Sequence, residues 1–337
     1  MVWVLRFWKY CRILAIILPA GLLFMFVIET RFLSRWHNTK NHLKVSHHKI
    51  QPKLTFRHPL MPPYPYPYKF TINQEDKCSS RKPFLVILVL SSCHDKATRT
   101  AIRETWGNES NYIGFEVVTV FLVGISSFRF ESIQWMLEEE SGTFGDIIQQ
   151  NFLDTYYNLT IKTLMGMEWV ATFCPNTNFV MKIDSDMFLN VDYLIHQLLL
   201  PQLPNSTNYF SGDVCTNGEP IRDKKYKWYV PVEVYPNKTY PPYCIGTGYV
   251  FSADLAKKIY EVAQVTTVMP MEDVFMGICL QKLNVPLTQP PGHVFNRYNY
   301  YDRCIFHKLV AIHIGGKYQL QKVWQDFWSK KSLGCKN

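Results

Sequence analysis

This 337-residue chain has no internal repeat, no concentrated basic region and a low charge density, with 19% of its residues charged. The absence of a repeat excludes a solenoid of stacked units. Because the Lys and Arg residues are scattered, the net charge of +9 does not indicate a nucleic-acid partner, and we expect none. With 47% hydrophobic residues the chain is not disordered, and its length suits one large α/β domain or two small ones plus an appendage.

A short apolar segment, ILAIILPAGLLFMFVI, runs from Ile13 to Ile28 and is followed by no small-x-small cleavage site. Its length is close to the lower limit of roughly 17 residues for a membrane-crossing helix, and the flanking Arg12 can extend toward the lipid headgroups. The missing cleavage site disfavours a cleaved signal peptide. We therefore expect a cytosolic tail at residues 1–12 and an uncleaved transmembrane anchor at residues 13–29.

The orientation of this anchor is not set by charge, because the basic residues on its two sides balance. Four N-x-Ser/Thr sequons follow the anchor, at Asn108, Asn158, Asn205 and Asn237. Eight of the nine cysteines also follow it, an even number that permits four disulfides without fixing their pairing. Sequons and cysteines together predict that everything after the anchor is lumenal.

Residues 30–77 lack periodicity and end in the Pro/Tyr run LMPPYPYPYKF, which favours an extended backbone. We interpret this segment as a stem, with a catalytic domain at residues 78–337. Apolar runs at residues 83–93, 117–124, 146–152 and 179–183 alternate with helical patterns at 97–106, 131–141 and 159–173. This alternation predicts an α/β fold with a mostly parallel sheet, whose ligands bind beyond the carboxyl ends of the strands.

Asp184-Ser185-Asp186 follows directly after the last of these strands. Two carboxylates at the end of a buried strand can reach one crevice and offer hard oxygen ligands to Mn²⁺ or Mg²⁺, leaving positions for a diphosphate. A solvated turn is the alternative, since most D-x-D sequences are only that.

Five ordered blocks extend the D-x-D signal: RTAIRETW at residues 99–106, FLDTYYNLTIKT at 152–163, MKIDSDMF at 181–188, YPPYCIGTGYVFS at 240–252 and EDVFMGICLQKL at 272–283. With these blocks the chain resembles the β-1,3-galactosyltransferases, within the Golgi β-1,3-glycosyltransferase family. The resemblance implies a GT-A type nucleotide-sugar-binding fold, a UDP-sugar donor, Mn²⁺ and a single-pass type II protein of the Golgi membrane.

The resemblance also implies roles for particular residues. Asp186 and the late His313 would ligate the metal, and Asp184 would contact the nucleotide side of the donor. Asp273 would be the general base; it follows Pro270 at the start of a helical pattern, where the helix dipole favours an ionised carboxylate. Its neighbour Glu272 is either a positioning carboxylate or a surface charge. The alternatives are that His313 is a core histidine and that Asp273 only caps the helix.

Other roles have alternatives of similar weight. Arg99 and Arg103 either help to hold the nucleotide or form a structural ion pair. Gly246 and Gly248 either let the backbone approach the sugars or form a tight turn. The run RDKKYKW at residues 222–228 suggests diphosphate contact and sugar stacking, or else a solvated loop with one buried Trp. Cys93 and Cys215 depart from the family's pattern and form an additional disulfide or stay unpaired.

The leading hypothesis is an inverting enzyme that transfers galactose from UDP-galactose to a glycan acceptor ending in N-acetylglucosamine. A β-1,3-N-acetylglucosaminyltransferase of the same family and a non-catalytic, lectin-like membrane glycoprotein are the alternatives. The acceptor, whether glycolipid, N-glycan or O-glycan, is not encoded in any pattern that we recognise.

Overall fold

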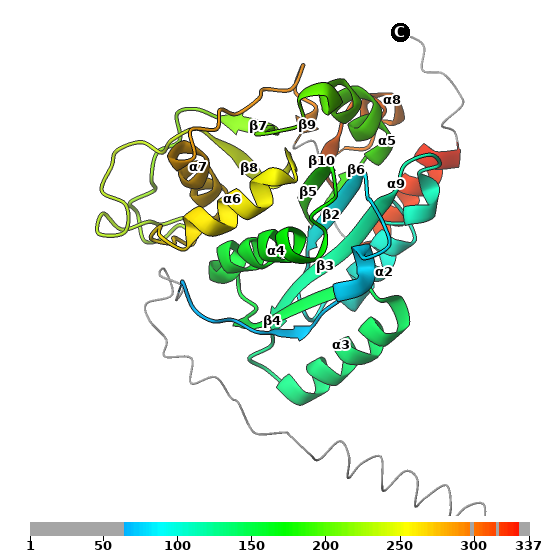
Figure 1. Ribbon diagram of the computed structural model, residues 1–337, viewed down its shortest axis with the longest axis horizontal. Coiled ribbons are helices and arrows are strands. Elements are labelled where there is room, and N and C mark those ends of the chain that lie inside the picture. The colour runs from blue at the N-terminus through cyan, green and yellow to red at the C-terminus, as the bar shows by residue number, and fades with distance from the viewer. Residues whose placement is uncertain (1–63, 297–299, 315–316, 330–337) are drawn as a thin grey trace, which may run out of the picture. The chain divides into compact units, whose positions relative to one another are not determined.

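The computed structural model describes residues 64–296, 300–314 and 317–329, and a seven-stranded mixed sheet forms its centre (Figure 1). The strand order is β1-β4-β3-β2-β5-β8-β7. The four middle strands, β4, β3, β2 and β5, are parallel, whereas β1, β8 and β7 pair antiparallel at the two sides. The bounds are β1 Phe70–Ile72, β2 Leu85–Leu90, β3 Val117–Ile125, β4 Ile147–Leu153, β5 Phe179–Asp184, β7 Phe210–Cys215 and β8 Tyr243–Ser252. The four strands predicted from apolar runs are confirmed.

Both faces of the sheet are covered, which explains why the parallel strands are apolar throughout. In β2 every side chain is buried, and alternate residues belong to different core clusters: Val86 and Leu88 to one, Leu85 and Ile87 to the other. The same alternation in β5 places Lys182 on the face of Val180. A charged side chain therefore enters an otherwise apolar face, directly before the D-x-D sequence.

Helices α4, α6 and α7 lie together on one face of the sheet (Figure 1). Helices α2 and α9 and a small second sheet, β6-β10-β9, pack on the other face. Helix α3 packs along β4. The bounds are α2 Lys96–Arg103, α3 Phe130–Phe144, α4 Leu159–Phe173, α6 Asp254–Ala263, α7 Glu272–Lys282 and α9 Lys317–Ser329, with β6 Met187–Leu189, β9 Phe295–Asn296 and β10 Ala311–His313.

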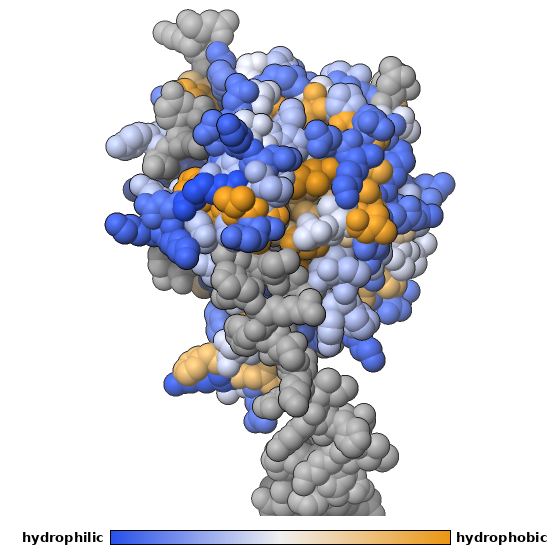
Figure 2. Space-filling view, turned by 90° about the vertical axis from the view of Figure 1, so that its left-hand side faces the viewer, coloured by the Kyte–Doolittle hydropathy of each residue, from blue (hydrophilic) through white to orange (hydrophobic). Residues whose placement is uncertain are grey.

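Short helical segments complete the described fold: η1 Glu75–Cys78, η2 Glu109–Asn111, η3 Tyr156–Asn158, α5 Val191–Tyr193, the π-helical η4 Leu194–Leu199, η5 Leu200–Asn205 and α8 Arg303–Phe306. Figure 2 shows the side of the molecule on which α6, α7 and the loop between β7 and β8 lie. Apolar side chains gather in the middle of this face and are surrounded by polar ones.

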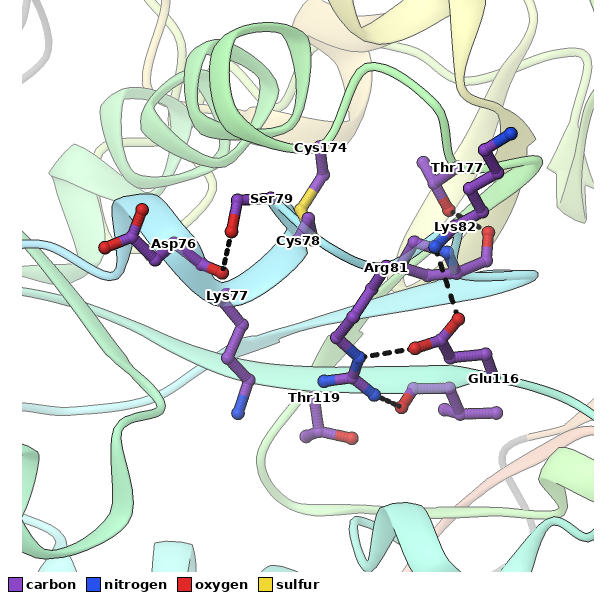
Figure 3. The surroundings of a disulfide bond; sticks show 12 residues. Asp76, Lys77, Cys78, Ser79, Arg81, Lys82, Glu116, Thr119, Cys174 and Thr177 are labelled. Carbon is purple, nitrogen blue, oxygen red and sulfur yellow. Dashed lines mark hydrogen bonds and ion pairs between the residues drawn. A yellow bond between two sulfur atoms is a disulfide. The ribbon is translucent and has the colours of Figure 1, made fainter.

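A disulfide joins Cys78, where the predicted stem ends, to Cys174 at the end of α4 (Figure 3). Beside it the Arg81 guanidinium forms an ion pair with Glu116 at 2.6 Å. Cys304 is also disulfide-bonded. Four disulfides are not formed, however, because Cys93, Cys215, Cys244 and Cys279 carry free thiols. Of the two alternatives for Cys93 and Cys215, the unpaired state is therefore confirmed.

The predicted cytosolic tail, the anchor at residues 13–29 and most of the stem lie outside the described residues. Among the helices that are described, none is both long and apolar enough to cross a membrane.

Candidate active site

A cleft of about 520 Å³ opens where β5 ends, on the side that the parallel sheet predicts for ligands. Its volume lies within the range of roughly 300–1,000 Å³ that is usual for small-molecule sites. Strand β8 is longer than its partner β5, so its first residues project past the end of β5 and form one wall. The start of α7 and the loop between β7 and β8 supply the rest. The sequence candidates that line this cleft are Asp184, Asp186, Gly246, Asp273 and His313.

Asp186 and His313 are the candidate pair of metal ligands. Strands β6 and β10 pair antiparallel with Met187 opposite His313, which brings the imidazole back beside the D-x-D turn. His313 Nε2 lies 3.1 Å from Asp186 Oδ2, and both side chains are well exposed to the cleft. The alternative that His313 is a core histidine is therefore wrong.

This donor set fits a divalent cation that completes its coordination with oxygen atoms from a ligand and from water. Within the described part of the chain, no three His, Cys, Asp or Glu side chains gather to hold a metal by themselves. The protein would thus provide two ligands and leave room for a diphosphate.

A buried ionic cluster connects the end of β5 to the start of α7. The side chain of Lys182 is only 2% exposed, and its ammonium group lies 2.9 Å from Asp184 Oδ1 and 3.3 Å from Glu272 Oε2. It also donates a hydrogen bond to the carbonyl oxygen of Gly246. Glu272 in addition accepts a hydrogen bond from the buried Tyr249 hydroxyl. Glu272 is therefore not a surface charge, and Lys182 and Tyr249 are site residues that the sequence reasoning missed.

Electrostatics in this cluster are dominated by burial. Burial raises the pKa of Asp184, Glu272 and Asp273, and the repulsion between these carboxylates raises the pKa of the first two further. Lys182 opposes these increases as a nearby positive charge. Its own pKa is raised by Asp184 and Glu272, against the effect of its burial. The lysine therefore stays charged and stabilises the ionised carboxylates around it.

Asp273 lies in the first turn of α7, as the sequence predicts, after Met271 at the N-cap position. Its two carboxylate oxygens accept hydrogen bonds from the backbone N–H groups of Val274, at 2.9 Å, and of Gly246 in β8, at 3.2 Å. These contacts hold the carboxylate between helix and strand while it still lines the cleft. The side chain is thus oriented by two elements and is available to a ligand.

Gly246 and Gly248 both lie inside β8, so neither forms a tight turn. A Cβ atom at Gly246 would lie 3.3 Å from Glu272 Oε2 and 3.4 Å from Asp273 Cβ. A Cβ atom at Gly248 would lie 3.0 Å from Met181 Cε, in the contact between β8 and β5. Gly246 therefore allows the acidic start of α7 to approach the strand, whereas Gly248 is not among the residues that line the cleft.

Arg99 and Arg103 do not line the cleft. Arg99 is buried and donates to both carboxylate oxygens of Glu140 in α3, at 2.7 and 2.8 Å. Arg103 pairs with Glu140 and with Asp146, each at 2.7 Å. The structural ion pair, rather than nucleotide binding, is the role that this geometry supports.

The run at residues 222–228 contributes to the cleft through Lys227 and Trp228. Trp228 is 42% exposed, so the alternative of a solvated loop with one buried Trp is wrong about this side chain. Arg222 instead organises the loop, because its guanidinium donates to the carbonyl oxygens of Val230, Tyr235 and Asn237.

The four sequons differ in their surroundings. Asn108 and Asn237 are exposed. Asn158 is partly buried and donates a hydrogen bond to the carbonyl oxygen of Leu153 at 2.8 Å, and the hydroxyl group of its sequon partner Thr160 is buried. The side chain of Asn205 is not among those that the structure describes. Among the three sequons whose asparagine side chains the structure describes, Asn108 and Asn237 are the two that are exposed to solvent.

Comparisons with known proteins give a consistent assignment. A family model described as galactosyltransferase matches residues 97–291. Beta-1,3-galactosyltransferase 2 is 47% identical in Mus musculus and 46% identical in Homo sapiens over 277 residues, which are 82% of this chain and 66% of each relative. Beta-1,3-galactosyltransferase 1 of Mus musculus is 44% identical over 272 residues, 80% of this chain and 82% of that protein.

This chain thus spans just under two thirds of the length of the first two relatives. Among solved structures, a glycosyltransferase involved in the glycosylation of the major capsid of PBCV-1 aligns over 72% of this chain and 100% of its own. That alignment has 9% sequence identity and a TM-score of 0.35.

Proposed function

Because this chain belongs to the galactosyltransferase family, we propose that it transfers galactose from UDP-galactose to the 3-hydroxyl of a terminal N-acetylglucosamine on a glycoprotein or glycolipid glycan. The observation that carries this proposal is the cleft in which Asp186, His313 and Asp273 come together at the carboxyl end of β5. The proposed fold is of the GT-A type, and the proposed metal is Mn²⁺ held by Asp186 and His313.

The proposed reaction is a single displacement with inversion at the anomeric carbon. Asp273 takes the proton from the acceptor hydroxyl as that oxygen attacks the face of the sugar opposite the departing UDP. Asp184 orients the nucleotide side of the donor and is held by Lys182, which also pairs with Glu272. Asp273 is held by the backbone N–H groups of Val274 and Gly246. Bound Mn²⁺ would offset the negative charge that develops on UDP.

Two other functions remain as alternatives. The first is a β-1,3-N-acetylglucosaminyltransferase, since a small change in a sugar pocket can alter the donor preference. The second is a lectin-like protein without turnover. The intact set of Asp184, Asp186 and Asp273 in one cleft favours catalysis over the lectin-like role.

A donor competition tests the proposal. The detergent-solubilised full chain is incubated with UDP-galactose, UDP-N-acetylglucosamine and an octyl β-N-acetylglucosaminide acceptor in the presence of Mn²⁺. We expect kcat/KM for UDP-galactose to exceed that for UDP-N-acetylglucosamine by at least about a hundredfold, the discrimination that a fitted sugar pocket provides. A preference for UDP-N-acetylglucosamine would favour the first alternative, and no transfer with either donor would favour the second.

The proposed location is the Golgi membrane, with residues 1–12 cytosolic, residues 13–29 as anchor, residues 30–77 as stem and residues 78–337 lumenal. The exposed sequons at Asn108 and Asn237 support this orientation. We expect an N-glycan-removing enzyme to increase the electrophoretic mobility of the native chain. The same treatment should have a smaller effect on the variant that combines Asn108→Gln and Asn237→Gln. No shift, together with protease access to the large domain in sealed vesicles, would contradict this topology.

A further inference from the structure

Two aromatic side chains at the cleft are exposed although they touch each other. Tyr156 follows β4 and is 43% exposed, and Trp228 in the loop between β7 and β8 is 42% exposed. The Trp228 indole N–H donates a hydrogen bond to the Tyr156 hydroxyl oxygen at 3.0 Å. Both line the same cleft as Asp273. Large rings that stay open to solvent at a concave site are characteristic of ligand contact.

The pair is held in place by its surroundings. The Lys227 ammonium lies 4.6 Å from the Trp228 ring centre and 5.4 Å from that of Tyr156, so one side of the pair is covered by a cation. Arg222 fixes the loop through three backbone carbonyl oxygens, at 2.6 to 3.1 Å. The rings therefore form a preorganised surface, and binding to it costs little conformational entropy.

Tyr156 belongs to the part of the fold that carries the base Asp273, rather than to the part that carries the metal ligands Asp186 and His313. Burial raises the pKa of Tyr156, and the negative charges of Asp273 and Asp184 raise it further against the hydrogen bond from Trp228. Tyr156 also begins the short helix that leads into α4, and α4 packs against α7, the helix that carries Asp273. Asp186 directly precedes β6 and His313 ends β10, and these two strands pack on the other face of the sheet from α4 and α7. The arrangement places aromatic surface on the side of the cleft where the group deprotonated by Asp273 must lie.

We propose that Tyr156 and Trp228 form the acceptor subsite, on which the apolar face of the terminal pyranose packs so that its 3-hydroxyl reaches Asp273. This inference rests on the proposed function and specifies its acceptor class. A β-linked N-acetylglucosamine has its ring substituents in equatorial positions, so both of its faces present C–H groups that suit an aromatic surface. Glu219, which lines the same cleft, supplies a polar partner for the sugar hydroxyls.

The competing occupant is the uracil ring of the donor, because a nucleobase also stacks on aromatic side chains. The two occupants predict different kinetic effects. Loss of an acceptor platform weakens acceptor binding alone, whereas loss of a nucleobase platform weakens the binding of UDP.

The test uses Trp228→Ala and Trp228→Phe in the full chain, with Tyr226→Ala as a matched control. Tyr226 is an exposed aromatic residue of the same loop that does not line the cleft. We expect Trp228→Ala to raise the KM for octyl β-N-acetylglucosaminide about tenfold, as the loss of an aromatic contact does. The KM for UDP-galactose and the rate of acceptor-free UDP-galactose hydrolysis should stay unchanged. Trp228→Phe should recover most of the loss, and Tyr226→Ala should behave as the native chain.

An unchanged acceptor KM in Trp228→Ala would overturn the inference, and so would a weaker affinity for UDP with normal acceptor binding. Saturation-transfer NMR with the same glycoside separates this outcome from a failure of the proposed function. If the native chain transfers no galactose, the proposed function fails. The subsite is then still supported if the glycoside binds the native chain and not Trp228→Ala, and it is overturned if both bind equally.

Discussion

Asp273→Asn is expected to lower kcat at least about a hundredfold, the typical contribution of a positioned general base. The amide keeps the size of the side chain and can still accept hydrogen bonds from Val274 and Gly246, so the start of α7 should remain in place. What is lost is the ability to take the acceptor proton. Initial-rate kinetics with UDP-galactose should show a nearly normal KM for the donor.

Asp254→Asn is a matched control for this variant. Asp254 is likewise an acidic residue in the first turn of a helix, α6, and it does not line the cleft. If Asp273 only stabilised its helix, both variants would lose about 1 kcal/mol of stability or less and both would keep their turnover. Near-normal turnover in Asp273→Asn would therefore contradict its assignment as the base.

The acid side of the pH profile gives independent information on Asp273. Burial raises the pKa of this carboxylate above its ordinary value, opposed by the hydrogen bonds from Val274 and Gly246. A base acts only when it is ionised, so kcat/KM should fall as the pH decreases through the raised pKa. The residual rate of Asp273→Asn should lack this contribution to the acid limb.

Asp186→Asn is expected to lower metal-dependent transfer by roughly a hundredfold or more, because a divalent cation contributes several kcal/mol to the stabilisation of transition-state charge. The change removes a carboxylate charge at the position nearest to His313. Thermal unfolding provides a readout besides activity: Mn²⁺ with UDP should raise the melting temperature of the native chain and not that of Asp186→Asn.

Asp192→Asn serves as the control for the metal site. Asp192 is a partly exposed carboxylate in α5, a few residues further along the chain and outside the cleft. It should keep both its transfer rate and its stabilisation by Mn²⁺ and UDP. Full transfer by a folded Asp186→Asn variant in chelator-treated buffer would rule out the metal role.

Much of the fold can be predicted from the sequence because its signals are local. The buried parallel strands are continuous apolar runs, and the pattern at residues 159–173 matches α4 from end to end. The start of α7 is likewise marked by Pro270 and two acidic residues. The D-x-D position follows from the same reasoning, since a polar pair after an apolar strand must emerge at the edge of the sheet.

The missed features depend on contacts between residues that are far apart in the chain. Arg99 meets Glu140 from another helix, and no local pattern distinguishes that ion pair from a phosphate-binding arginine. Lys182 could have been recognised, because it lies two residues before Asp184 on the same face of a buried strand and therefore needs a partner. That its partners include Glu272 is set by how α7 packs on β8, which the sequence does not reveal.

The most direct test of the account is the structure of the product that the chain makes from UDP-galactose and a glycan ending in N-acetylglucosamine. NMR spectroscopy and digestion with a linkage-specific β-galactosidase identify the anomer and the linked hydroxyl group. The account predicts a β-linked galactose on the 3-hydroxyl, formed by inversion of the α-linked donor. An α-linked product, or a β-linked product at another hydroxyl, would contradict it.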